Sequence, residues 1–265
     1  MGNPEGRRTG LLDGRTALVT GAGTGIGRAT ALMLAEEGAT VVLVGRRPHL
    51  LAEVAAVVEG AGGRAVVHPA HVDKADDVRE LVERTREVAG PVDILVNNAG
   101  GAGHEGDVRR LGEDEWNAVL GVNLTGVYLL TRAVLPDMVE RGGGSIITIS
   151  SLAAIRPTSL GGAPYGAAKA GVRSFMTYLR NTFGDDLVRA TCILPGEVDT
   201  PVLDSRPQPP SEERRAAMVR PKDVARAVLL CATLPPRTVV EELVIAPTSS
   251  GWSGGRPAPG PRRPS

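Results

Sequence analysis

The sequence predicts an α/β protein: a doubly wound, mostly parallel sheet of seven strands, with helices on both faces, built as a single domain. Two observations predict this fold class. Short β-branched runs alternate along the chain with longer segments of helical period. The runs are also apolar throughout, as expected for parallel strands that helices cover on both faces. The length of 265 residues fits one such domain, because a single core stops growing at about 250 to 300 residues.

The predicted strands are short runs rich in Val, Ile, Leu and Thr. In chain order they are 16–20, 40–44, 65–69, 92–97, 145–150, 190–195 and 242–247. The segments between them carry apolar residues three and four positions apart, which is typical of amphipathic helices. Segment 28–37 is an example, because Gly38 follows its last apolar residues as a helix-ending glycine. Longer helices are predicted around 113–141 and 163–184.

The two ends of the chain differ in composition from its body. Residues 1–12 are predicted to form a flexible N-terminal tail, residues 13–248 the domain, and residues 249–265 a disordered tail rich in Gly, Pro and Ser. The proline-rich stretch 201–215 directly follows a predicted strand. It is interpreted either as a mobile lid over a pocket or as a plain surface loop.

Composition argues against several classes of protein. The formal net charge is zero, which gives no electrostatic support for nucleic-acid binding. Cys192 and Cys231 are the only cysteines, too few for a disulfide framework and without the spacing of a zinc site. The first residues lack the apolar core of a signal peptide, and no run of about 18 uncharged apolar residues occurs. We therefore expect a cytoplasmic protein with no metal, membrane or nucleic-acid partner.

A glycine-rich turn follows the first predicted strand. The stretch reads TGAGTGIGRAT, with glycines at Gly21, Gly25 and Gly27. Glycines at a strand-to-helix turn allow positive φ and let a pyrophosphate approach the backbone, while the helix amino terminus offers free N–H groups. A P-loop would need Gly-Lys-Ser/Thr at the helix start, but Arg28 and Ala29 follow Gly27. The turn predicts a dinucleotide site, although alone it also fits a tight βα connection.

Three further motifs follow this turn: NNAG at 97–100, SS at 150–151 and YGAAK at 165–169. With them, and with PGEVDT at 195–200, the chain resembles the short-chain dehydrogenase/reductase family in its single-domain form. The motifs occur in the family's order, and the resemblance covers about residues 13–247. It implies a Rossmann-like fold and an oxidoreductase that uses NAD(P).

The resemblance implies a catalytic set of Asn123, Ser151, Tyr165 and Lys169. A helix would place Tyr165 and Lys169 on one face, although an isolated pair with this spacing also fits a solvated surface. A phenol with a pKa near 10 needs a nearby cation to act as a general acid/base at neutral pH, and Lys169 would supply it. Ser151 would hold the substrate oxygen, with Ser150 as the alternative, and the Asn123 backbone would join a proton relay to the lysine.

The resemblance also implies a set of cofactor-binding residues. Val198 and Thr200 would contact the carboxamide of the nicotinamide, and Asn97 would be the structural tie beside the adenosine half. The complete set is Gly21, Thr24, Gly25, Ile26, Gly27, Arg46, Arg47, His71, Val72, Asn97, Ala99, Gly100, Tyr165, Lys169, Pro195, Gly196, Val198 and Thr200.

The end of the second strand bears on which nicotinamide cofactor is bound. Gly45 stands where NAD-binding relatives have an acid, and Arg46 and Arg47 follow it. Cations without a carboxylate favour NADP(H), and NAD(H) stays possible. Thr24 is a competing detail, because many NADP-preferring relatives have a basic residue there. His71 replaces the aspartate that usually contacts the adenine.

The sequence thus predicts an NADP(H)-dependent oxidoreductase that transfers hydride between the nicotinamide and a ketone or secondary alcohol. The alternatives are an NAD(H)-dependent alcohol dehydrogenase of the same family and a non-catalytic dinucleotide-binding sensor. Epimerases and dehydratases with this site usually have a longer carboxyl-terminal domain. We expect a homodimer or homotetramer that pairs through the two long helices. The substrate class stays open, and the candidate lining residues are Leu152, Ile155, Gly162, Glu197 and Leu203.

Overall fold

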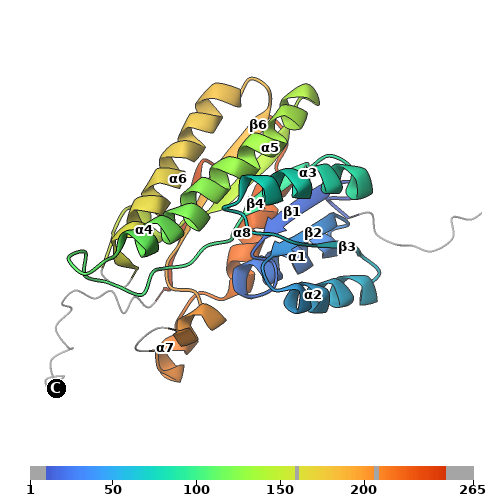
Figure 1. Cartoon of the computed structure of the whole chain (residues 1–265). Helices are drawn as coiled ribbons and strands as arrows, with labels where there is room; N and C mark the ends of the chain where they lie inside the picture. The colour runs from blue at the N-terminus through green and yellow to red at the C-terminus, as the bar shows by residue number, and fades with distance from the viewer. Residues whose placement is uncertain (1–9, 159–160, 206–208, 249–265) are drawn as a thin grey trace, which may run out of the picture.

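Seven strands form one sheet in the order β3-β2-β1-β4-β5-β6-β7, and every neighbouring pair is parallel. This computed structural model describes residues 10–158, 161–205 and 209–248 (Figure 1). The sequence-based fold class is confirmed, because the sheet is doubly wound with helices on both faces. The strands are β1 (Thr16–Thr20), β2 (Thr40–Gly45), β3 (Arg64–Pro69), β4 (Ile94–Asn97), β5 (Gly144–Ile149), β6 (Val188–Pro195) and β7 (Glu242–Ile245).

Two layers of helices enclose the sheet (Figure 1). One layer contains α1 (Gly25–Glu36), α2 (Pro48–Gly60) and α8 (Pro221–Thr233). The other contains α3 (Ala75–Ala89), α4 (Glu113–Leu120), α5 (Gly126–Glu140) and α6 (Gly162–Phe183). Helix α1 begins three residues earlier than the periodicity indicated. Gly38, with φ +94°, ends it by donating its N–H to the Ala35 carbonyl at 3.0 Å.

The central strands divide their side chains between two apolar cores. Ala17 and Val19 of β1 pack in the core beneath α1, α2 and α8, whereas Leu18 between them packs beneath α3, α5 and α6. All three are fully buried, as expected for a strand whose successive side chains point to opposite faces. The central strands are therefore covered on both sides.

The two edge strands depart from the pattern of continuous burial. In β3 and β7, every residue is either exposed or only partly buried, and Val244 of β7 is 52% exposed. An edge strand has a neighbour on one side only, and its apolar composition does not reveal this position. The expectation that every apolar run is covered on both faces is therefore wrong for these two strands.

The direction of the strand order reverses beside β1. The chain runs outward from β1 to β2 and β3, then crosses to β4 on the other side of β1 and continues to β7. In open α/β sheets, ligands bind outside the carboxyl ends of the strands at this reversal. Here the glycine-rich turn follows β1 and the NNAG stretch follows β4, so the fold brings these two motifs to the same edge.

The predicted helix around 113–141 is interrupted by a π-helical turn, η1 (Gly121–Thr125), between α4 and α5. The run Glu113–Glu140 is long and apolar enough to cross a membrane by length and composition alone. Helices that pack inside globular cores also meet this criterion, and this run packs against α3, α6, β4 and β5. The second long helix, predicted at 163–184, is α6.

The proline-rich stretch after β6 is more regular than the predicted loop. It contains a 3-10 helix, η3 (Pro201–Ser205), and a short helix, α7 (Glu212–Ala216), and Figure 1 shows α7 apart from the two helical layers. Residues 1–9 of the first predicted tail (1–12) and all of the second (249–265) lie outside the described residues. Leu12 was assigned to the first tail, but it is buried and its N–H bonds the Glu37 carbonyl at 2.8 Å.

Candidate active site

The glycine-rich turn leaves no room for side chains at its three motif positions. Gly21 and Gly25 have positive φ, +64° and +53°, a conformation that favours glycine. A Cβ at Gly27 would lie 2.2 Å from the Gly21 carbonyl oxygen. The turn therefore brings its backbone close to the amino terminus of α1, where free N–H groups suit a phosphate. This cradle fits the pyrophosphate of a dinucleotide.

Asn98 ties the glycine-rich turn to the end of β4. Its side-chain amide donates to the Thr20 carbonyl at 2.8 Å, and its backbone N–H donates to the Thr20 hydroxyl at 2.9 Å. The sequence motif predicted this role for Asn97. Instead, Asn97 is 3% exposed and its amide donates to the Thr148 hydroxyl of β5. The missed signal is position, because Asn98 is the first residue after the strand and is free to reach across the sheet edge.

Arg46 and Arg47 lie at the carboxyl end of β2, and both are exposed. Neither guanidinium group makes a hydrogen bond or an ion pair with any residue of the described ranges. Their guanidinium groups are therefore available for a phosphate. His71 is also exposed, and its backbone N–H donates to the Asp77 carboxylate at 2.8 Å. Val72, by contrast, is buried, and its side chain packs against the start of α5.

Asn123 lies inside the π-helical turn and is 1% exposed. Its side-chain amide donates to the carbonyls of Gly101 and Val119, each at 2.9 Å, and its Oδ1 accepts from the Gly101 N–H at 3.3 Å. The polar groups of the side chain are thus used in hydrogen bonds that fix the loop after β4. A π-turn changes the pairing of backbone carbonyls, which suits the predicted role of the Asn123 backbone.

The two serines after β5 have different surroundings. Ser150 is 3% exposed, and its hydroxyl donates to the Lys169 carbonyl at 3.0 Å. Ser151 is partly exposed and accepts the Ala153 N–H at 3.1 Å, which caps the 3-10 helix η2 (Leu152–Ala154). An accepting hydroxyl still has its own proton to donate. The geometry therefore favours Ser151 for contact with a substrate oxygen, in addition to its capping role.

Tyr165 and Lys169 lie one turn apart on α6, as predicted, but they do not form a solvated surface pair. Tyr165 is partly buried and Lys169 is only 4% exposed. The Lys169 ammonium lies 5.4 Å from the centre of the Tyr165 ring and donates to the Ile149 carbonyl at 2.9 Å. A buried cation beside a phenol favours the phenolate form of that phenol.

Burial lowers the pKa of Lys169 to about 8, because desolvation disfavours the charged ammonium, and nearby Cys192 opposes this shift. Burial likewise raises the pKa of the Cys192 thiol to about 11. The cysteine is therefore neutral around neutral pH, whereas the lysine still carries its charge. The lysine is the one member of this pair that can stabilise a phenolate.

The segment after β6 meets the glycine-rich turn. A Cβ at Gly25 would lie 3.1 Å from Cγ2 of Thr200, so the Thr200 side chain rests on that turn. Gly196 approaches the Leu152 side chain, with 3.3 Å between a Cβ at Gly196 and Leu152 Cδ1. Elements following β1, β5 and β6 therefore converge, and together they can hold a dinucleotide beside the tyrosine.

The candidate substrate-lining residues are not equivalent. Leu152 is partly exposed and Ile155 is 41% exposed, whereas Leu203 is 2% exposed. Glu197 forms an ion pair with Arg214 of α7 at 2.8 Å. Leu203 therefore belongs to the packing of the segment that follows β6, and its side chain is not open to a substrate.

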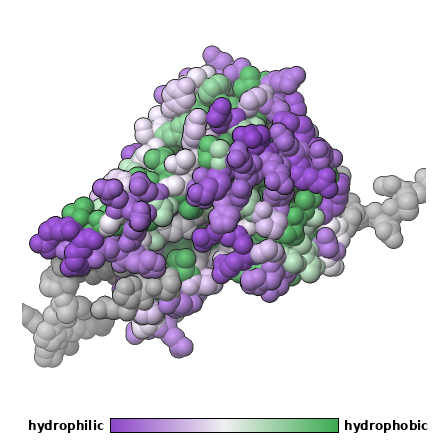
Figure 2. All heavy atoms as spheres, viewed as in Figure 1, coloured by the Kyte–Doolittle hydropathy of each residue, from purple (hydrophilic) through white to green (hydrophobic). Residues whose placement is uncertain are grey.

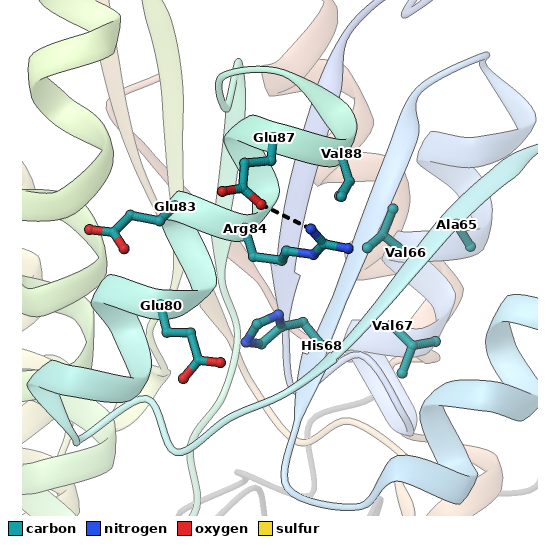
Figure 3. Close-up of a pocket in the computed structure, with 9 residues that line it drawn as sticks. All are labelled: Ala65, Val66, Val67, His68, Glu80, Glu83, Arg84, Glu87 and Val88. Atoms are coloured by element: carbon teal, nitrogen blue, oxygen red, sulfur yellow. Dashed lines mark hydrogen bonds and ion pairs between the residues drawn. The ribbon is translucent and has the colours of Figure 1, made fainter.

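A hollow of about 520 Å³ lies elsewhere, between β3 and α3 (Figure 3). Its charged lining consists of carboxylates with His68 and Arg84, and Arg84 pairs with Glu87 at 2.9 Å. None of the motif residues lines it. The converging sequence motifs are a stronger guide to the chemistry than the size of a surface hollow. Among the described residues, no cluster of His, Cys, Asp and Glu is arranged to hold a metal ion.

The chain matches the family described as short chain dehydrogenase over residues 15–210. It is 33% identical over 230 residues to the 3-oxoacyl-acyl-carrier-protein reductase of Thermotoga maritima, which covers 84% of this chain and 92% of that relative. A metagenomic short-chain oxidoreductase solved in complex with NADP is 34% identical, with a TM-score of 0.79 over 90% of this chain and 99% of that one. A 3-ketoacyl-(acyl-carrier-protein) reductase of Brucella melitensis, solved with NADH, is 31% identical, with a TM-score of 0.79 over 88% and 97% of the two chains.

A methyl group at Gly100 should disturb the catalytic centre. A Cβ there would lie 2.5 Å from Asn123 Oδ1 and 3.3 Å from Lys169 Nζ. We expect Gly100→Ala to lower kcat by about ten- to hundredfold, because small displacements of positioned groups are costly. Gly101→Ala is the matched control, since a Cβ there would meet nothing within 4 Å. Equal kcat values in the two variants would contradict the proposed steric constraint.

The burial of Lys169 should make stability depend on pH. Between pH about 8 and the ordinary value of 10.5, the unfolded lysine holds a proton that the folded one has lost. The free energy of unfolding should therefore rise with pH in this window, relative to Lys169→Met, by about 1–3 kcal/mol. Urea unfolding of both proteins at about pH 7 and about pH 10 measures this. If the difference in the free energy of unfolding between wild type and Lys169→Met stays constant or falls as pH rises, the pKa of Lys169 is not lowered by burial.

Proposed function

The chain belongs to the short-chain dehydrogenase/reductase family, and we propose that it is an NADP(H)-dependent oxidoreductase that interconverts a ketone and a secondary alcohol. Family membership makes it an oxidoreductase that acts on CH–OH or C=O groups with NAD(P). The observation that carries the proposal is the buried ammonium of Lys169 beside the ring of Tyr165. A dinucleotide-binding sensor would use the lysine only to hold its ligand, and it would have no need of a phenol beside the ammonium.

We propose that Tyr165 exchanges the proton at the substrate oxygen. Lys169 stabilises the phenolate by its charge, and Ser151 donates its hydroxyl proton to the same oxygen. Asn123 fixes the loop after β4 beside the lysine, and its backbone takes part in proton movement. When bound, the nicotinamide supplies or accepts the hydride. The protein residues therefore bind and orient the substrate and move a proton, while hydride transfer is the chemistry that the cofactor would supply.

We propose that Arg46 holds the 2′-phosphate that distinguishes NADP(H) from NAD(H), with Arg47 beside it. Support comes from the exposure of both side chains, and from the fact that neither guanidinium group has a partner in the described part of the chain. A phosphate could therefore pair with them directly, whereas at Arg214 or Arg215 it would have to displace a carboxylate. Solved relatives contain either NADP or NADH, so the preference rests on these two side chains.

We also propose that the protein forms a homodimer or homotetramer through α4, α5 and α6. Tyr128 and Tyr178 are 45% and 57% exposed. Phe175 lies between them, with its ring centre 6.4 Å from each of theirs. Aromatic side chains are enriched in interfaces. Figure 2 shows hydrophobic groups scattered among hydrophilic ones on the viewed face, so this aromatic group supports the assignment more than the general surface does.

Tyr165→Phe should separate chemistry from binding. Removing the hydroxyl abolishes proton transfer, so we expect turnover to fall by about 10²- to 10⁴-fold with little change in cofactor affinity. Lys169→Ala should lower both. Tyr178→Phe is the matched control, because Tyr178 lies on the same helix with its side chain exposed. Steady-state kinetics with a panel of ketones and fluorescence titration measure the two effects, and undiminished turnover in Tyr165→Phe would remove the tyrosine from its role.

Arg46→Asp should change cofactor preference. The new carboxylate repels the 2′-phosphate and can accept ribose hydroxyls, so the ratio of NADPH to NADH affinity should fall by about tenfold or more. Parallel fluorescence titrations with NADPH and NADH measure this ratio. Arg64→Asp makes the same charge change at the start of β3. This residue lies at the amino ends of the parallel strands, away from the proposed cofactor site, so the variant should leave the ratio unaltered. An unchanged ratio in Arg46→Asp would exclude Arg46 from the phosphate site.

A further inference from the structure

The stretch between β6 and α8 is closed by a short pairing of backbone groups. The Asp199 N–H donates to the Val219 carbonyl at 2.9 Å, and the Val219 N–H donates to the Glu197 carbonyl at 3.1 Å. The side chains of Val198 and Val219 are both buried. The residues directly after β6 are therefore fixed to the residue pair that precedes α8.

The Asp199 carboxylate strengthens this closure through two arginines. Its Oδ1 pairs with Arg215 of α7 at 3.2 Å, and its Oδ2 pairs with Arg220, which precedes α8. The Asp199 and Arg215 side chains are 21% and 22% exposed, so water screens their interaction less than it screens an exposed pair. We call these three residues the Asp199 clamp. The clamp connects Asp199, near the start of the stretch, to Arg215 in α7 and to Arg220 directly before α8.

The residue next to the clamp contacts the glycine-rich turn. Thr200 follows Asp199, and a Cβ at Gly25 would lie within 3.3 Å of both Cβ and Cγ2 of Thr200. Gly25 itself has positive φ and begins α1. Any shift of Asp199 away from its arginines would therefore move Thr200 relative to the proposed pyrophosphate cradle.

We propose that Asp199 is a positioning residue that sets the affinity for the nicotinamide half of the dinucleotide, acting through Thr200. This inference rests on the proposed function, because it needs a dinucleotide in the cradle. The adenosine half lies toward β2, where Arg46 and Arg47 are placed, and makes no use of the clamp. Breaking the clamp should thus weaken binding of the whole cofactor and spare binding of its adenosine half.

Asp204 provides the matched control. It also pairs with Arg215, but its side chain is 66% exposed and it lies in η3, away from Gly25. Asp204→Asn removes one negative charge from the same arginine and leaves both contacts of Asp199 in place. Asp199→Asn removes the charge that both arginines share.

The experiment measures dissociation constants for NADPH, NADH and 2′,5′-ADP in wild type, Asp199→Asn and Asp204→Asn. With the dinucleotide that wild type binds more tightly, Asp199→Asn should raise Kd by about fivefold or more, as is usual for a coupling of this kind. Its Kd for 2′,5′-ADP, or for 5′-AMP if wild type prefers NADH, should be unchanged. Asp204→Asn should match wild type with every ligand. If Asp199→Asn does not fold, Arg215→Met is measured in its place with the same expectation.

Two results would overturn the assignment of Asp199. The first is an unchanged dinucleotide Kd in Asp199→Asn. The second is an equal loss of affinity for the dinucleotide and its adenosine half, which would indicate a general structural role. Failure of wild type to bind either dinucleotide would instead overturn the proposed function and the assignment together. The wild-type titration therefore distinguishes the two failures.

Discussion

The active site depends on an ammonium group that the fold buries with no carboxylate of the described residues paired to it. Lys169 is 4% exposed, and its hydrogen bond goes to the Ile149 carbonyl. Burying an unpaired charge lowers stability, and the pKa of Lys169, lowered to about 8, measures that cost. The surrounding fold must supply the compensation. The benefit is positional, because the ammonium is held 5.4 Å from the centre of the Tyr165 ring, where it can stabilise the phenolate.

The rest of the site follows from keeping that cation in place. β5 presents the Ile149 carbonyl, and Ser150 directly after it bonds the Lys169 carbonyl. The lysine is thereby fixed at its ammonium and at its backbone by consecutive residues of one strand end. In the loop after β4, Gly100 has no side chain and so leaves space for the ammonium. The buried side-chain amide of Asn123 fixes this loop by donating to the carbonyl of the next residue, Gly101. The π-helical turn supplies the local backbone geometry for that asparagine.

Local patterns in the sequence were sufficient to predict much of this arrangement. Apolar runs located all seven strands within about two residues, and the spacing within YGAAK predicted that Tyr165 and Lys169 share a helix face. Contacts between distant segments were harder to predict. The tie from Asn98 to Thr20 spans 78 residues, and only its position directly after the predicted strand distinguishes Asn98 from Asn97. The Asp199 clamp uses Arg215, at the end of a proline-rich stretch that was predicted as either a mobile lid or a surface loop, and Arg220, which follows that stretch.

Two residues that depart from the family pattern, His71 and Arg46, have exposed side chains. The loop that contains His71 is held by the backbone N–H of this residue, which donates to the Asp77 carboxylate, so the loop does not depend on the His71 side chain. Arg46 is likewise exposed beyond β2. The matching residues Asn123 and Lys169 are buried, where substitution would also affect the fold. Cofactor recognition can therefore vary at the exposed positions, while the proton-transfer groups are constrained by packing as well as by chemistry.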